Sequence, residues 1–466
     1  MLISRRTALL SGAVTLGLIG GRRALRAESS DSFEQPLYPK FPRTTLARIR
    51  SVETSTIRGA GWASASDVTM DAKAPAEDRP YGESEVQLAM SGANSVASYY
   101  TGAAAVAPVD VRKGNIVISI RNVANMRAVR SYYAVSVVLC SAGSPATPAA
   151  HCHKVAIQRI FGEKAQSASF RQEISIPINR FSAVGSGADL SAITYALVSW
   201  KRNAGPAVTF CPGDIDFQPN PRIDDLTPII LRFDGGYISQ YTYGFRALTS
   251  AFGGAAPALL HDPLYFIGSG HKQVMDWADV ADWVAHGAEF APHNGTSSNR
   301  LADEAAYTSE HRTARLGAKA KGYDHSGSTG AYYSKVDVGT KDYVYAVMRN
   351  RIYRMLLNYT SGDNTAVPMA FGGETFPPGD RWNIRCMNGD SWFKGDADKH
   401  VTDWMNGVRD NRGLGVIVFH AGLAKAGPGR VTFDTLIANM LAGRDKFTLT
   451  TPCALFDPYV AQYGGV

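Results

Sequence analysis

The stretch Pro228-Ile-Ile-Leu-Arg-Phe-Asp-Gly-Gly-Tyr237 decides the predicted fold of the second half of this chain. It is a short apolar run that ends in Asp234, and the two glycines after it let the backbone turn sharply beside the carboxylate. Further strand-like runs alternate with helical windows, the runs at 287–292, 366–371, 415–419 and 447–451 and the windows at 274–286, 303–321, 341–359, 399–408 and 433–442. Repeated strand–helix units predict an α/β fold with a parallel sheet or barrel.

Polar side chains follow three of the predicted strands. Asp234 follows the first strand, His293 follows the run at 287–292, and His420 follows the run at 415–419. In barrels of strand–helix units the chemistry lies at the carboxyl ends of the strands, so we expect these three side chains to converge at one face. A carboxylate with two imidazoles suits general acid–base catalysis, metal binding or both, and we predict all three as catalytic residues.

The same stretches resemble motifs of the polysaccharide deacetylase family, the NodB-homology carbohydrate esterases. Arg232-Phe-Asp-Gly-Gly-Tyr237 is similar to the family's T-F-D-D-G-Y, His293-Asn-Gly-Thr-Ser297 to its H-[ST]-x-x-H, and Val418-Phe-His420 to its L-x-H. The resemblance covers about residues 228–458. It implies a distorted βα barrel and deacetylation, in which a metal polarises an acetyl carbonyl, Asp234 activates water and His420 protonates the leaving group.

The metal ligands depart from the family pattern. The family holds zinc or a similar divalent ion with the second Asp of D-D and two histidines, and here Gly235 and Ser297 stand at two of these positions. Only His293 remains as a predicted metal ligand, which falls short of the usual three-ligand arrangement. The cofactor prediction therefore stays open between a zinc-like divalent metal and none.

Other residues are predicted to bind or orient the substrate. Arg232 replaces the family's Thr and adds a cation that could bind an anionic sugar. The family places an arginine near the base after a mid-barrel strand, and Arg381 or Arg385 occupies that region, while Asp403-Trp404 resembles the motif that holds the catalytic histidine. The predicted substrate-binding set is Arg232, Tyr237, Glu374, Arg381, Arg385 and His325.

Residues 44–219 have a different texture, which predicts a β-sandwich ahead of the barrel at 220–466. The stretches 114–121, 131–140 and 192–200 alternate apolar and polar residues. We interpret the sandwich as a candidate glycan-binding domain, in which five aromatic residues either form a sugar-stacking platform or pack in the core: Tyr99, Tyr100, Tyr132, Tyr133 and Trp200. Five cysteines are present, and we predict a disulfide between Cys140 and Cys152, which bracket a short polar loop.

The first 27 residues predict an export signal. Arg5-Arg6 precedes the weakly apolar segment 8–21, whose 14 residues are too few for a membrane span of about 20. This pattern resembles a twin-arginine signal, with an ordinary secretory signal as the alternative. With residues 28–43 as a linker, we predict a bacterial protein that works in the periplasm or outside the cell, with no stable membrane span.

The net charge of +7 indicates little about a partner. Five arginines and no acidic residue lie in residues 1–27, so without them the charge falls to +2. No dense Lys/Arg run interleaved with aromatic residues is present, which disfavours a nucleic-acid partner. We expect a polysaccharide partner, anionic ones included.

Three functions remain open at this point. The first is deacetylation of an N- or O-acetylated polysaccharide. The second is metal-independent cleavage of a polysaccharide by a lyase or hydrolase that uses the same residues. The third is a non-catalytic glycan-binding protein on a relic barrel, which the acid–base residues at the strand ends disfavour.

Overall fold

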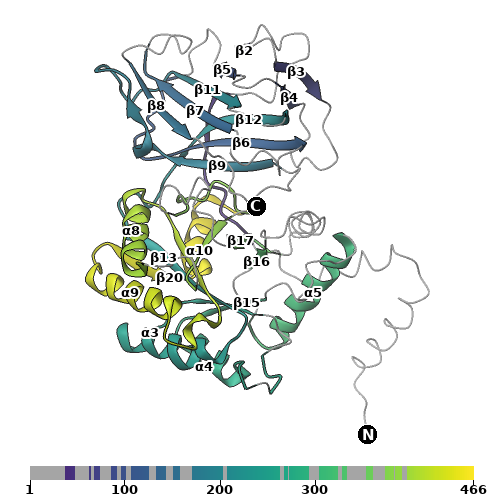
Figure 1. Cartoon of the computed structure of the whole chain (residues 1–466), viewed down its shortest axis with the longest axis vertical. Coiled ribbons are helices and arrows are strands. Elements are labelled where there is room, and N and C mark those ends of the chain that lie inside the picture. The colour runs from purple at the N-terminus through teal and green to yellow at the C-terminus, as the bar shows by residue number, and fades with distance from the viewer. Residues whose placement is uncertain are drawn as a thin grey trace, which may run out of the picture. The chain divides into compact units, whose positions relative to one another are not determined.

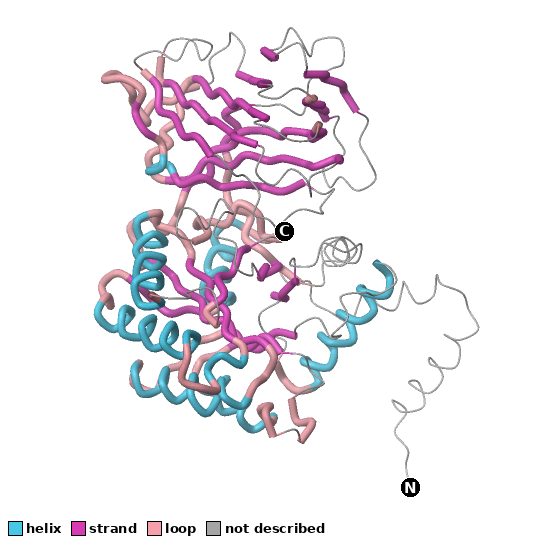
Figure 2. Tube along the Cα trace, viewed as in Figure 1, coloured by secondary structure: helices cyan, strands magenta, loops and turns pink. Residues whose placement is uncertain are grey.

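The computed structural model describes residues 37–47, 62–64, 68–73, 85–91, 96–100, 107–124, 133–142, 151–157, 171–202, 207–262, 267–270, 272–292, 304–323, 328–332, 353–359, 373–382, 384–390 and 396–466. Residues 1–36, with the predicted export signal, lie outside these ranges. Figure 2 distinguishes a region built of strands from a region in which strands and helices alternate.

The strands before residue 220 form two antiparallel sheets (Figure 1). One has the order β3-β4-β12-β6-β9, with β1 also pairing with β12, and the other has the order β10-β8-β7-β11-β5-β2. The strands are β1 Thr44–Ala47, β2 Trp62–Ser64, β3 Val68–Lys73, β4 Glu85–Met90, β5 Val96–Tyr100, β6 Gly114–Ala124, β7 Tyr133–Cys140, β8 Cys152–Ile157, β9 Arg171–Pro177, β10 Ser182–Ala183, β11 Tyr195–Arg202 and β12 Val208–Pro219, with a 3₁₀ turn η2 at Ile178–Arg180.

One apolar core joins the two antiparallel sheets, so this region is a β-sandwich as predicted. Buried residues alternate with more exposed ones along β11, and its buried set packs with side chains of the other sheet such as Ile118. Trp200 belongs to that core at 2% exposure and is not part of a sugar platform. The side chains of the other proposed platform residues lie outside the described residues: Tyr99, Tyr100, Tyr132 and Tyr133.

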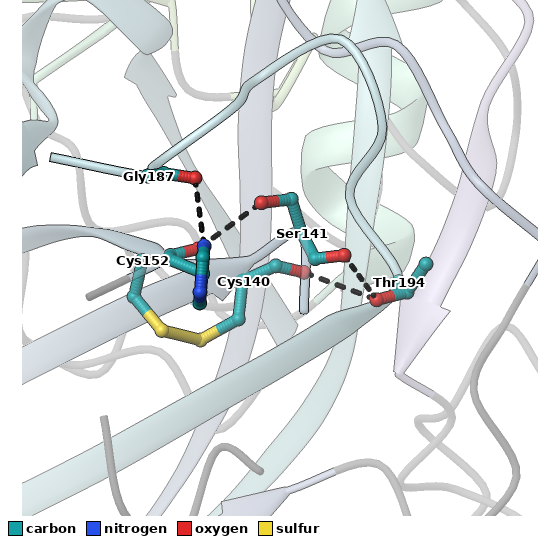
Figure 3. The surroundings of a disulfide bond; sticks show 6 residues. Cys140, Ser141, Cys152, Gly187 and Thr194 are labelled. Carbon is teal, nitrogen blue, oxygen red and sulfur yellow. Dashed lines mark hydrogen bonds between the residues drawn. A yellow bond between two sulfur atoms is a disulfide. The ribbon is translucent and has the colours of Figure 1, made fainter. Parts of the chain in front are cut away.

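The predicted disulfide between Cys140 and Cys152 is confirmed. The two residues face each other in the ladder between β7 and β8. Around them, the Thr194 hydroxyl donates to the carbonyl of Ser141 (Figure 3). The backbone N–H of Ser141 donates to the carbonyl of His151. The bond therefore joins neighbouring strands whose ends are also held by hydrogen bonds.

From residue 227 onward the strands form a parallel sheet with the order β15-β14-β13-β19-β18-β17-β16, and β20 also pairs with β13. The strands are β13 Thr227–Asp234, β14 Leu259–Asp262, β15 Glu289–Pro292, β16 Ser328–Tyr332, β17 Met355–Tyr359, β18 Ile384–Asn388, β19 Gly415–Phe419 and β20 Phe447–Thr450. The predicted α/β class is thus confirmed for this region.

Strand β13 is the centre of the parallel sheet. β19 pairs with it from Ile229 to Phe233, while β20 pairs with its first half and β14 with its last three residues. All eight residues of β13 are buried, as is typical of a parallel strand covered on both faces. Since β13 and β19 run in the same direction, the residues that follow them lie at the same edge of the sheet.

Two apolar clusters cover the faces of the parallel sheet. Ile229, Leu231 and Phe233 pack under the helices of one face, whereas Ile230 faces a second cluster of strand residues and residues of α10. The helical elements are η3 Gln240–Phe245, a π-helix, then α3 Arg246–Ala251, α4 Trp277–Ala285, α5 Glu304–Ala320, α8 Ala397–Asp410, η4 Ala421–Leu423, α9 Pro428–Ala442 and α10 Pro452–Tyr463.

The second half of the predicted linker is packed rather than extended. Tyr38 and Phe41 belong to the same cluster as Ile230, and the ring of Tyr38 lies 5.3 Å from that of Phe456 in α10. Residues 37–43 therefore contribute to the core, because burial of their aromatic side chains is more favourable than exposure of these side chains to water.

The parallel sheet curls strongly. The side chain of Arg232 in β13 donates to the carbonyl of Leu357 in β17, although β19 and β18 lie between these strands in the sheet order. The edge strands β15 and β16 come into contact, yet no ladder joins them within the described ranges. Closure into the distorted barrel expected from the motifs stays a prediction.

One helical prediction is wrong at its end. Residues 355–359, expected to complete a helix from 341, form the strand β17 between β16 and β18, because a short apolar run fits either structure. Residues 341–352 and the expected strand at 366–371 lie outside the described residues. In the described part of the chain, no helix combines the length and apolar character that crossing a membrane needs.

Candidate functional site

The structure brings Asp234 and His420 together at the carboxyl edge of the parallel sheet. Phe233 and Phe419 are register partners, so Asp234, the last residue of β13, and His420, which follows β19, lie side by side at that edge. The Nε2 atom of His420 lies 3.6 Å from Oδ2 of Asp234. His293, the third residue expected here, lies outside the described residues together with Ser297 and His325.

Asp234 is held by Arg232. The guanidinium donates from Nε to Oδ1 and from Nη2 to Oδ2, each at 2.5 Å, and both side chains are almost fully buried. Because residues two apart on a strand share a face, the pair forms within β13 itself. Burial alone would lower the pKa of Arg232, but the carboxylate of Asp234 outweighs it and raises that pKa above the ordinary arginine value.

Arg232 has no surface left for a substrate. It is 0% exposed, and Nη1 lies against the carbonyl of Leu357 at 3.1 Å and the sulfur of Cys386 at 3.6 Å. Burial raises the pKa of the Cys386 thiol to about 11, which keeps it protonated at neutral pH. The prediction that Arg232 binds an anionic sugar is therefore corrected: its charge is used inside the protein.

His261 is a site residue that the sequence analysis missed. It lies on β14, is 0% exposed, and its Nδ1 is 3.5 Å from Oδ1 of Asp234. Its strand has only four residues, and a polar residue at the end of a short apolar run is the signal that could have identified it. Asp234 thus lies between two imidazoles, one on each oxygen.

Asp390 holds the ring of His420 and was also missed. Its Oδ2 accepts from Nδ1 of His420 at 2.8 Å and from the backbone N–H of His420 at 2.7 Å. Asp390 follows β18, and its own backbone N–H donates to Oδ1 of Asn388 in a tight turn. The carboxylate favours the tautomer with hydrogen on Nδ1, and Nε2 faces Oδ2 of Asp234.

The sequence assigned the histidine-holding role to Asp403, and this assignment is wrong. Asp403 is exposed on α8 and forms an ion pair with Lys399, while its neighbour Trp404 is 5% exposed in the core. Asp390 makes the contacts with His420 because the end of β18 lies next to the end of β19 in the sheet.

Gln240 ties the strand ends together. Its Nε2 donates to the carbonyl of Asp234 at 2.7 Å and lies 3.2 and 3.3 Å from the carbonyls of Phe419 and His420. One buried amide therefore fixes the turns that carry both predicted catalytic residues. Nothing in the sequence pattern singled it out.

The remaining predicted residues are placed differently. Tyr237 lies over the turn beside Asp234, since a Cβ at Gly235 would meet its ring at 2.7 Å. Glu374 pairs through its backbone with Leu414, ahead of β19 and so at the opposite edge of the sheet. Arg381 donates to the carbonyl of Val466 and stacks on Trp382. Arg385 lies within β18, and its side chain is not among those described.

The described donors do not fit the divalent metal that the motifs imply. Among the described residues, no group of three or more His, Cys, Asp or Glu side chains could hold a metal ion. Gly235 offers no side chain where the family has its metal-binding Asp, and both oxygens of Asp234 already accept from Arg232. A guanidinium at that place repels a second cation.

Exposure separates the roles of the charged groups. The side chain of His420 is 20% exposed and that of Asp390 is 17%, whereas Asp234 is 3% exposed. The ring of His420 is thus partly exposed at this edge, while its Nε2 atom is itself buried beside the carboxylate of Asp234. A histidine held by a carboxylate in this way suits proton transfer once a substrate group comes within reach of Nε2.

No family model matches the chain, and no curated protein matches it. Similar solved structures include the family 11 carbohydrate-binding module from Clostridium thermocellum in complex with a β-1,3-1,4-mixed-linked tetrasaccharide, at 12% identity, 37% of this chain, 94% of that chain and a TM-score of 0.25. The family 30 carbohydrate-binding module of the cellulosomal cellulase Cel9D-Cel44B of Clostridium thermocellum matches at 14% identity, 37% and 96% coverage and a TM-score of 0.28. The Streptococcus pyogenes deacetylase PplD in complex with acetate matches at 13% identity, 34% and 63% coverage and a TM-score of 0.25. At such TM-scores these likenesses carry no argument about what this chain binds or catalyses.

Proposed function

We propose that this chain is an exported carbohydrate-active enzyme that performs metal-independent general acid–base chemistry on a polysaccharide. The observation that supports this best is His420, whose Nδ1 is held by Asp390 at 2.8 Å while its ring stays partly exposed beside a buried carboxylate. A histidine fixed by a carboxylate at Nδ1 is suited to proton transfer at its other ring nitrogen. The polysaccharide substrate and the export rest on the sequence motifs.

His420 has both proton-transfer roles in this proposal. Its neutral ring takes a proton at Nε2 from the attacking water, and the resulting imidazolium returns that proton to the oxygen of the leaving sugar. Asp390 stabilises the imidazolium and keeps the ring in place. The carboxylate of Asp234, which Arg232 neutralises, lies 3.6 Å from Nε2.

Deacetylation of an N- or O-acetylated polysaccharide is the second candidate. It is favoured by the positions of Asp234 and His420, which correspond to the family's base and acid and lie next to each other. In this candidate Asp234 must accept a proton from water while each of its oxygens also accepts a hydrogen bond from Arg232. The donor set around Asp234 makes this the less favoured reaction.

Product analysis on a panel of neutral, acetylated and uronate-containing polysaccharides tests the proposal. Shortened or unsaturated oligosaccharides support the first candidate, and free acetate with intact chains supports the second. His420→Ala and Asp390→Asn are expected to lower kcat/KM by about 10²–10⁴-fold with unchanged circular dichroism. His400→Ala, an exposed histidine on α8, is the matched control and should keep full activity.

The third function, glycan binding without catalysis, has its own signature. If the chain binds a polysaccharide of the panel but turns none over, or if His420→Ala retains full turnover, the proposed enzyme mechanism is rejected. Isothermal titration with the same polysaccharides measures that binding independently of any product.

A further inference from the structure

We infer that the edge formed by Asp234 and His420 works without the divalent metal that the resembling family uses, because Arg232 neutralises Asp234 from within β13 and leaves it a fixed anion of the site. This inference rests on the proposed acid–base function of His420 and assigns the roles of the two buried charges beneath it. Arg232 and Asp234 are positioning residues in this scheme, because neither needs to touch the substrate.

The contacts of Asp234 leave little room for a metal ion. The arginine fork donates to each carboxylate oxygen, and Nδ1 of His261 and Nε2 of His420 approach the same two oxygens at 3.5 and 3.6 Å. A zinc ion bound to Asp234 would have to lie about 2.0–2.2 Å from one of these oxygens. It would then lie against the guanidinium, without solvent to screen the repulsion.

The guanidinium is itself anchored and cannot be exchanged. Its third nitrogen contacts the carbonyl of Leu357 in β17 and the sulfur of Cys386 in β18, so Arg232 is held from three strands of the curled sheet. A metal ion can be removed by a chelator, whereas this charge is covalently part of β13. Chelators and added divalent ions should therefore leave the turnover of the protein unchanged.

The turn after Asp234 gives independent support. Gly235 has a φ of 91°, a conformation that favours glycine, and a Cβ there would meet the ring of Tyr237 at 2.7 Å. The position where the family carries its metal-binding Asp is thus closed to a side chain by backbone and by packing. The arginine within the strand and the glycine after it both oppose metal binding.

Metal titration of the unmodified full chain is the first test. Zn²⁺ and Co²⁺ are titrated calorimetrically, with the visible absorption of Co²⁺ as a second readout, and bound metal is measured after dialysis. We expect no saturable binding, and turnover within twofold before and after treatment with EDTA. One equivalent of bound metal that is lost in Asp234→Asn would overturn the inference.

Variants of Arg232 are the second test. Arg232→Lys keeps a charge without the fork and should retain part of kcat, whereas Arg232→Met keeps the length without the charge and should lose at least about 10²-fold with KM little changed. Equal kcat values for the two variants would contradict the electrostatic role. If Arg232→Met does not fold, the double variant Arg232→Met/Asp234→Leu is used in its place. It removes both buried charges, so we expect it to fold and to remain inactive.

The two proposals fail in different ways. Stoichiometric metal binding together with an inactive His420→Ala removes the inference and leaves the acid–base function. A fully active His420→Ala removes the acid–base function whatever the metal titration gives.

Discussion

Strands β11 of the sandwich and β13 of the parallel sheet bury their residues in different ways. Buried and partly exposed residues alternate along β11, so a charged residue such as Lys201 reaches water. Every residue of β13 is buried, and a charged residue there has no route to solvent. A charged side chain on the fully buried strand is therefore tolerated only if another residue neutralises it.

Arg232 and Asp234 satisfy that requirement together. Each is nearly inaccessible, and each is the principal partner of the other. Replacing a buried pair by apolar residues is often tolerated, but removal of one partner leaves an uncompensated charge. The pair is therefore weak evidence for stability as such and stronger evidence for a site that needs a fixed charge.

The largest expected effect is that of Arg232→Met on folding. The variant leaves the carboxylate of Asp234 buried without its guanidinium, and we expect the free energy of unfolding to fall by about 3–5 kcal/mol in urea denaturation. Lys201→Met on β11 is the matched control and should change it by less than about 0.5 kcal/mol. Equal losses of unfolding free energy in the two variants would show that the burial of β13 does not decide the cost of removing a charged side chain.

Removal of the disulfide is expected to have the next largest effect, confined to the sandwich. Cys140→Ala/Cys152→Ala should lower the free energy of unfolding by about 2–4 kcal/mol, because the bond restricts the unfolded chain. Turnover of the folded protein should not change, since the bond lies on β7 and β8. Cys453→Ala, a cysteine without a disulfide, is the control. A loss of turnover in the double variant would show that the parallel sheet depends on the sandwich edge.

The sequence predicted Asp234 and His420 because each follows a strongly apolar run. His261 lies in β14 and Asp390 follows β18, and both strands are short and carry polar residues, so neither strand stood out. The pairing of Arg232 with Asp234 agrees with their spacing of two on one strand, which places both side chains on the same face. The opposite-edge placement of Glu374 depends on how the segment after β17 returns to the sheet, which no local pattern encodes.

The carboxyl group of Asp380 also has a buried oxygen, Oδ2. Although part of the residue is exposed, burial, reinforced by the charge of Glu173, outweighs the backbone hydrogen bonds from Trp382 and Glu173 and raises the pKa of Asp380 to about 7. Folding therefore favours the protonated acid, and the native state loses stability as the pH rises from about 4 to about 7. Below that range the penalty is absent, and above it the penalty is constant.

We expect Asp380→Asn to remove this pH dependence. The amide oxygen can still accept from the backbone N–H of Trp382, and at pH 8 the variant should be more stable than the parent by roughly 1–3 kcal/mol. At pH 4 the two proteins should agree, as measured by urea denaturation at both values. A variant that is less stable at pH 8 would show that the carboxylate has a compensating partner.

The smallest expected effect is that of Gly422→Ala, which concerns the exposed half of the site. A Cβ at this position would lie 2.2 Å from Oδ1 of Asp390, so the carboxylate must turn away from Nδ1 of His420. We expect kcat/KM to fall about tenfold, or about 1.4 kcal/mol, with little change in unfolding. Gly427→Ala is the control, because a Cβ there has no atom closer than 3.9 Å. Full activity in Gly422→Ala would mean that His420 does not need Asp390 in this position, and the exposed pair would then differ from the buried one only in its accessibility.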